Sequence, residues 1–171
     1  MSTATATRES ILNILAEVKD PELPMIDVVE LGIVRDVSFD EGHLRVDITP
    51  TYSGCPAMQV IEKEIVSTLH AHGFDDVVIR TVYSPAWTTD WMTAEAREKL
   101  REHGIAPPGR VEVSEGGIAE LVSLRRAKPT IECPFCGSAN TVQKSEFGST
   151  ACKAIHFCNS CHQPFDLFKS F

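Results

Sequence analysis

Hydrophobic side chains near the start of the chain recur at two different spacings. Over residues 7–18 they return every three or four positions, which predicts an amphipathic helix built on Ile11, Leu12, Leu15 and Val18. Asp20 precedes a proline and therefore avoids the helical region, so we expect the helix to have stopped by then and a loop to span residues 21–24. Residues 33–39 and 43–49 carry strand patterns, and Asp40-Glu41-Gly42 between them predicts a hairpin turn.

The middle of the chain continues with helix, strand and helix patterns. Residues 57–72 predict a helix that ends at Gly73 and buries one apolar stripe, consisting of Ile61, Ile65 and Leu69. Residues 77–82 form a short β-branched run, and residues 93–103 form a polar helix that Gly104 closes. The order helix, hairpin, helix, strand, helix predicts a small α+β domain over residues 8–108, with its helices packed on one face of a short sheet.

The rest of the chain separates into an extension and a tail. Residues 111–124 can add one strand or more, and a basic linker follows, made of Arg125, Arg126 and Lys128. We therefore predict an extension and linker over residues 109–128 and a second domain over residues 129–171. The charge divides at nearly the same place: residues 1–126 carry 12 Lys and Arg against 21 Asp and Glu, whereas residues 127–171 carry 4 against 3.

Composition narrows the classes of function. The 171 residues carry a formal net charge of −8, which argues against nucleic acid as a main partner because phosphate binding needs a basic face. Apolar runs stay short of the roughly 18 residues that a membrane span needs, and residues 1–7 lack the pattern of a secretory signal. We expect a cytoplasmic protein with reduced thiols, so its six cysteines favour metal binding or catalysis over disulfides.

Four cysteines of the tail form two C-x-x-C pairs with 21 residues between them: Cys133, Cys136, Cys158 and Cys161. Two such turns brought together give a tetrahedral four-sulfur site, which suits zinc and some iron–sulfur centres. A closed four-cysteine shell leaves no open position for chemistry, and so short a tail needs the metal to fold, so we expect a structural role. The alternatives are a disulfide framework and haem attachment, because residues 158–162 also match C-x-x-C-H, a pattern that normally belongs to exported proteins.

The fifth cysteine of the tail, Cys152, lies outside this spacing. It can be a plain buried residue, an extra thiol for a labile cluster, or a contact to another protein. The nearby His156 and His162 are predicted to be exposed polar residues rather than metal ligands.

The first domain holds one cysteine, Cys55, between Gly54 and Pro56 at the place where a helix should begin. A thiol there feels the positive end of the helix dipole and free N–H donors, and both favour the nucleophilic, metal-binding thiolate. The alternative is a small buried apolar residue. A Cys–His nucleophile also needs a histidine as its base. The domain has four histidines, and none is well placed for this role: His43, His70, His72 and His103.

Hydroxyl and carboxylate groups can support this thiol. Thr49 and Ser53 lie in the loop that precedes it. An acidic segment earlier in the chain can approach the thiol in the fold and assist metal binding; its members are Asp20, Glu22, Asp27 and Glu30. Capping of turns and helices is an equally open explanation for the carboxylates.

Three motifs of the first domain resemble those of a known family. They are Asp20-Pro21-Glu22-Leu23-Pro24 followed by Glu30-Leu31-Gly32-Ile33-Val34, the loop from Thr49 through Gly54-Cys55-Pro56, and Trp87-Thr88-Thr89-Asp90-Trp91-Met92. In order and spacing they resemble the metal–sulfur cluster assembly family that includes SufT-like proteins. The tail resembles the zinc ribbon that follows such a domain in proteins of phenylacetate degradation. The resemblance lies in its four cysteines and in residues 147–153 and 164–166.

The resemblance implies an accessory component of the multicomponent phenylacetyl-CoA epoxidase, rather than an enzyme that turns over phenylacetyl-CoA. Its partners would be a di-iron oxygenase and a reductase with an iron–sulfur cluster and flavin. The family's motif cysteine maps onto Cys55, which would assemble or deliver an iron or iron–sulfur centre with further ligands from a second copy, a partner or a small thiol. The alternatives are an adaptor that docks oxygenase to reductase, and a nucleic-acid-binding ribbon, which the nearly neutral tail disfavours.

Overall fold

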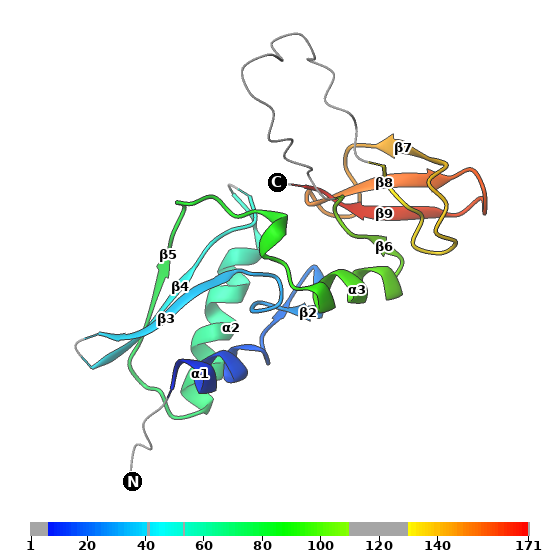
Figure 1. Ribbon diagram of the computed structural model, residues 1–171. Helices are drawn as coiled ribbons and strands as arrows, with labels where there is room; N and C mark the ends of the chain where they lie inside the picture. The colour runs from blue at the N-terminus through cyan, green and yellow to red at the C-terminus, as the bar shows by residue number, and fades with distance from the viewer. Residues whose placement is uncertain (1–6, 41, 53, 110–129, 171) are drawn as a thin grey trace, which may run out of the picture. The chain divides into compact units, whose positions relative to one another are not determined.

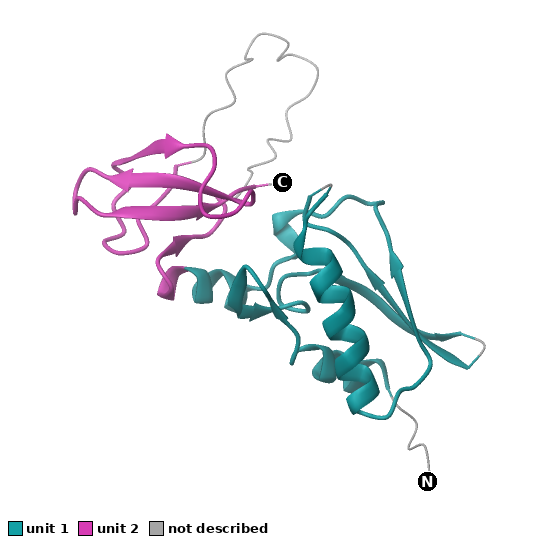
Figure 2. Ribbon diagram, turned by 180° about the vertical axis from the view of Figure 1, so that it is seen from behind, with its two compact units in different colours: residues 1–100, 171 teal, residues 101–170 magenta. Residues whose placement is uncertain are grey.

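The computed structural model describes residues 7–40, 42–52, 54–109 and 130–170 (Figure 1). The chain divides into two compact units, residues 1–100 with residue 171, and residues 101–170 (Figure 2). The strands expected within residues 111–124 and the basic linker after them lie outside the described residues. Among the helices that are described, none is long and apolar enough to cross a membrane.

The first unit packs helices against a three-stranded sheet, which confirms the α+β class that the hydrophobic pattern predicts. Its helical elements are α1 (Arg8–Leu15), α2 (Ala57–Ala71), the short 3₁₀ turn η1 (Thr89–Trp91) and α3 (Ala94–Glu102), which crosses into the second unit. Its strands are β1 (Lys19–Asp20), β2 (Leu23–Asp27), β3 (Val34–Asp40), β4 (His43–Ile48) and β5 (Val77–Thr81).

The order of the strands in this sheet is β3-β4-β5. The β3 and β4 strands form the antiparallel hairpin, whereas β5 lies parallel to β4 and the α2 helix makes the crossover between them. Alternating residues of β4 (Val46 and Ile48) and the apolar stripe of α2 (Ile61 and Ile65) are almost fully buried and form the core. The loop over residues 49–56 thus leaves the carboxyl end of a parallel strand and enters a helix N-terminus, the usual place for sites in α/β units.

Two elements near the start of the chain differ from the prediction. The α1 helix ends at Leu15, and Val18 is buried by the turn that follows rather than by the helix itself. The prolines at 21 and 24 suggest a loop, but residues 19–27 form the two-stranded β1–β2 hairpin. Proline is compatible with this arrangement because a two-stranded ribbon leaves one edge of each strand without a ladder hydrogen bond.

The second unit is built on a four-stranded sheet in the order β6-β9-β8-β7. Its strands are β6 (Ile105–Ala106), β7 (Thr141–Ser145), β8 (Lys153–Cys158) and β9 (Pro164–Phe168). The last three are antiparallel neighbours, whereas β6 runs parallel to β9, with Ile105 opposite Asp166. Residues 105–106, which the sequence pattern places at the end of the first domain, therefore contribute a strand to the sheet of the second unit.

Candidate functional site

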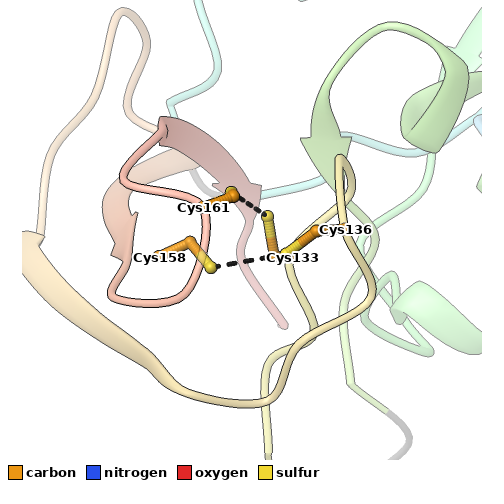
Figure 3. A group of neighbouring side chains, drawn as sticks. All are labelled: Cys133, Cys136, Cys158 and Cys161. Carbon is orange, nitrogen blue, oxygen red and sulfur yellow. Dashed lines mark hydrogen bonds between the residues drawn. The ribbon is translucent and has the colours of Figure 1, made fainter.

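The four C-x-x-C cysteines converge at one end of the second unit (Figure 3). The Sγ atoms of Cys133 and Cys161 lie 3.7 Å apart, those of Cys136 and Cys158 lie 3.6 Å apart, and all four lie within 4.8 Å of one another. Cys133 and Cys158 are buried, Cys161 is half-buried and Cys136 is exposed. The two pairs that the spacing predicts therefore form a single four-sulfur group with one side open to solvent.

The sulfur positions fit a tetrahedral metal ion. A metal–sulfur distance of about 2.3 Å in a regular tetrahedron requires sulfur–sulfur distances of about 3.8 Å. The Cys133–Cys161 and Cys136–Cys158 sulfur–sulfur distances are close to this value. Four thiolates at this spacing suit zinc, and the same donor set is available to iron.

The two cysteine turns have the same backbone design. The N–H of Gly137 donates to the carbonyl of Cys133 at 2.8 Å, and the N–H of His162 donates to the carbonyl of Cys158 at 2.9 Å. Both donors have positive φ angles, 71° and 59° respectively. His162 thus occupies the position that glycine holds in the first turn, so a local turn explains the histidine that completes the C-x-x-C-H pattern.

Polar contacts tie the two turns together beside the sulfur atoms. The hydroxyls of Ser138 and Ser160 are 2.8 Å apart, and Asn159 donates to Asn140 from both its backbone N–H and its side-chain amide. Sequence reasoning did not single out these residues, because the contacts join segments that are about twenty positions apart. The contacts hold the two halves of the ligand set in register.

The thiols of the group differ in acidity. A backbone N–H bond from Cys161 is the main cause that lowers the pKa of the Cys158 thiol to about 6. Burial raises the pKa of the Cys161 thiol to about 12. The low pKa of Cys158 favours its thiolate, whereas a metal ion that binds must displace the proton of the Cys161 thiol.

Cys152 is absent from the four-sulfur group. It precedes β8, whereas Cys158 ends that strand, and an extended segment of six residues spans about 20 Å. Cys152 is buried, and its Sγ lies 3.0 Å from the Thr150 hydroxyl. His156, expected to be exposed, is instead buried in β8 against Phe165, and burial lowers its pKa.

Cys55 has a different environment from the tail cysteines. It is half-buried and lies next to Pro56, the N-cap residue of α2, which provides no side-chain hydrogen bond to the first turn. Its carbonyl accepts the N–H of Met58 at 3.3 Å, and its own N–H donates to Tyr52. The exposed Gly54 before it has a φ of 81°, the left-handed turn that leaves the approach to the thiol without a side chain.

The predicted supporting groups have distinct roles in the structure. Thr49 is 1% exposed, and its hydroxyl oxygen has no hydrogen-bond partner among the described residues. The Asp20 carboxylate accepts the N–H groups of Glu22 and Leu23 and so caps the β1–β2 turn, although β1 itself packs against α2. Ser53 lies outside the described residues.

Asp27 and Glu30 also bind neighbouring groups of the first unit. The Asp27 carboxylate accepts the N–H groups of Val29 and Glu30. Glu30 pairs with Lys99 at 2.5 Å. These hydrogen bonds account for both carboxylates as structural groups of the opening motif.

The three motifs singled out in the sequence meet in the first unit. The indole N–H of Trp87 donates to the carbonyl of Leu31 at 3.1 Å, and the N–H of Thr49 donates to the carbonyl of Ile33 at 2.9 Å. At Gly32, where φ is 74°, an added Cβ would lie 2.8 Å from the carbonyl oxygen of Trp91. The opening motif therefore contacts both the tryptophan motif and the loop that leads to Cys55.

Comparison with known families identifies both units. Residues 8–79 match the family model described as iron-sulfur cluster assembly protein, and residues 119–169 match the PaaD zinc beta ribbon domain. A relative in Escherichia coli K12, named as one of the subunits of a putative 1,2-phenylacetyl-CoA epoxidase, is 45% identical over 157 residues, covering 91% of this chain and 88% of the relative.

Shorter relatives match about half of this chain. The Fe-S protein maturation auxiliary factor YitW of Bacillus subtilis is 37% identical over 97 residues, which are 56% of this chain and 94% of that protein. SufT of Staphylococcus aureus, also named an Fe-S protein maturation auxiliary factor, is 40% identical over 47% of this chain and 93% of its own. A crystal structure of a DUF59 domain from Bacillus anthracis superimposes with a TM-score of 0.50 at 29% identity, over 54% of this chain and 90% of its own.

Proposed function

This chain belongs to the PaaD family of phenylacetyl-CoA epoxidase components, and from that membership we propose that it is a maturation factor for the epoxidase. In this proposal it helps to assemble or deliver an iron or iron–sulfur centre through Cys55. Its partners are the oxygenase and reductase components, and its place is the cytoplasm. It is a non-catalytic component of the phenylacetate-degrading system.

The observation that carries this proposal is the position of Cys55. Its thiol is half-buried at the start of the uncapped α2 helix, in a loop joined by a hydrogen bond to the opening motif. A bound centre must be reached and released, so a delivery site needs partial exposure and fewer protein ligands than a storage site. The iron-sulfur cluster assembly family model matches residues 8–79, which include this thiol, and this supports the same assignment.

The chemistry of Cys55 in this role is that of a single thiolate ligand. One thiolate cannot hold an iron–sulfur cluster alone, so the cargo needs further ligands from the client, a second copy of the chain or a small thiol. Thr49 and Ser53, with Asp20 and Glu22 from the β1–β2 hairpin, are the groups proposed to support the thiol. The buried Thr49 hydroxyl, which has no partner among the described residues, is one available donor.

The ribbon is proposed to hold zinc in a structural role through Cys133, Cys136, Cys158 and Cys161, whose geometry fits this ion. Bound there, the ion would link two segments that otherwise share a small core, which includes Ala106 and Phe165. Four protein ligands fill its coordination shell, which is why delivery is assigned to Cys55 and not to the ribbon.

The test is a Cys55→Ser variant co-produced with the epoxidase components, with Cys152→Ser as the matched control. We expect both variants to fold and to retain ribbon metal, because neither residue belongs to the four-sulfur group. The epoxidase purified from the Cys55→Ser strain should lack iron, whereas the epoxidase from the control strain should be fully loaded. Full iron content and activity with Cys55→Ser would refute delivery through this thiol.

A docking role makes the opposite prediction. An adaptor that only joins oxygenase to reductase would form a stable stoichiometric complex that Cys55→Ser leaves intact. Gel filtration of the co-produced components measures this directly. A stable complex together with normal iron loading in the variant would establish the adaptor role in place of the maturation role.

A further inference from the structure

We propose that residues 104–106 belong to the folded structure that surrounds the four cysteines. Metal binding by these cysteines and the docking of β6 onto the ribbon are then thermodynamically linked. These residues precede the matched ribbon family segment, which starts at residue 119. They lie just beyond α3, which begins in the first unit. The proposal is independent of whether Cys55 carries a cargo.

The first observation is the position of Ala106 in the core of the ribbon. Ala106 is 1% exposed and shares a buried cluster with Cys133, Cys158 and Phe165. Two metal ligands, one from each C-x-x-C turn, thus belong to the same core as a residue of β6. The strand is held there by parallel pairing of Ile105–Ala106 with β9.

The second observation is a close contact between the first cysteine turn and Gly104. The ring of Phe135, which lies between Cys133 and Cys136 in sequence, covers Gly104 so closely that an added Cβ would be 3.0 Å from two ring carbons. Gly104 also has a φ of 73°, which an L side chain rarely adopts. The backbone just before β6 is therefore shaped to accept a residue from the metal-binding turn.

Linkage follows from these two contacts. A ribbon of this size has too small a core to fix its cysteine turns without metal, so the position of the first turn depends on the bound ion. When that turn loses its position, Ala106 loses its contact with Cys133 and Gly104 loses its contact with Phe135. By reciprocity, the factor by which bound metal strengthens β6 docking equals the factor by which docked β6 strengthens metal binding, so a change that undocks β6 must weaken metal binding.

The first test measures zinc affinity by chelator competition in the full chain. Ala106→Leu crowds the core position, and Ala151→Leu makes the same change at an exposed position of the ribbon. Overpacking at this buried position destabilises the core, so we expect Ala106→Leu to weaken zinc binding at least about fivefold, which is about 1 kcal/mol, and Ala151→Leu to leave it unchanged. Equal affinities in the two variants would overturn the proposal.

The second test uses the unmodified protein, so it stands even where Ala106→Leu fails to fold. Hydrogen exchange is followed at the amides of residues 105–106 in the zinc-loaded protein and after removal of zinc with a chelator. We expect these amides to lose protection together with those of the cysteine turns, while the β4 amides of the first unit keep theirs. Unchanged protection of residues 105–106 without zinc would show that β6 docks independently of the metal.

Discussion

Among the glycines of the first unit, Gly32 is the one at which an added methyl group should cost the most stability. Its φ of 74° lies in the left-handed region, where an L residue pays about 1–2 kcal/mol. An added Cβ would also meet the Cβ and the carbonyl oxygen of Trp91 at 2.8 Å. The carbonyl belongs to the backbone, so no rotation of a side chain can relieve this contact.

The expected magnitude for Gly32→Ala is the sum of these two effects. Overpacking against a fixed neighbour adds about 1–3 kcal/mol to the backbone cost, for a total of about 2–5 kcal/mol. Gly73→Ala is the matched control, because Gly73 has a φ of 87° but nothing within 4 Å of an added Cβ. It should lose only the backbone contribution, so the difference between the two variants measures the contact with Trp91.

Tryptophan fluorescence during thermal unfolding is the appropriate assay. Both tryptophans of the chain, Trp87 and Trp91, belong to the first unit, so the signal reports that unit and not the ribbon. In a unit of this size each kcal/mol lowers the midpoint by about 4–8 °C, so Gly32→Ala should melt at least about 4 °C below Gly73→Ala. Coincident midpoints would refute the close packing between the opening motif and the tryptophan motif.

Two further predictions concern the metal and the charges. Cys136→Ser should lose the stoichiometric metal of the ribbon, whereas Cys152→Ser should keep it, as elemental analysis of purified protein would show; equal metal content in both would contradict the four-sulfur assignment. Burial favours a higher pKa for the Glu30 carboxyl, but hydrogen bonds from Lys99 and from the N–H of Asp27 outweigh it and hold the pKa below the usual 4.5. A lowered folded-state pKa adds stability above the unfolded value and loses it as the pH falls through the folded value. Lys99→Met should therefore destabilise the first unit at pH 7, and this loss should shrink as the pH falls through the lowered folded pKa of Glu30, which urea unfolding followed by fluorescence at a series of pH values would measure; a loss that does not change with pH would exclude the ion pair as the cause.

The elements that were predictable from the sequence are those whose signal is local. The apolar stripe and the glycine that follows it locate α2 to within one residue at each end, and the alternating residues of β3 and β4 define their hairpin. The four cysteines were identified for a similar reason. Each C-x-x-C pair is a local motif, and two such pairs predict one site without knowledge of how the rest of the tail folds. In each case neighbouring residues contain the information.

The elements that were missed depend on partners far along the chain. Strand β6 has only two residues and follows a glycine, and it exists because Ile105 and Ala106 pair with β9. His156 has the composition of an exposed polar residue, but Phe165 from the neighbouring strand covers its ring. Hydrophobic periodicity cannot reveal such pairings, since the cause lies in the partner strand and not in the segment itself.

The contrast between the four-sulfur group and the thiol proposed for delivery gives a physical reason for one chain to contain both. In the ribbon, two of the four cysteines are buried, and polar contacts such as Ser138–Ser160 hold the turns in place. An ion bound there would have four protein ligands and would dissociate slowly. In the proposed role, Cys55 provides one thiolate at a helix start, with an exposed glycine before it, so a centre bound there would need further ligands besides this thiol. A site that lacks ligands of its own favours transfer, because the client's ligands then add to the shell instead of displacing protein ligands. Stable binding and transfer thus require opposite ligand sets, which a single cysteine site could not combine.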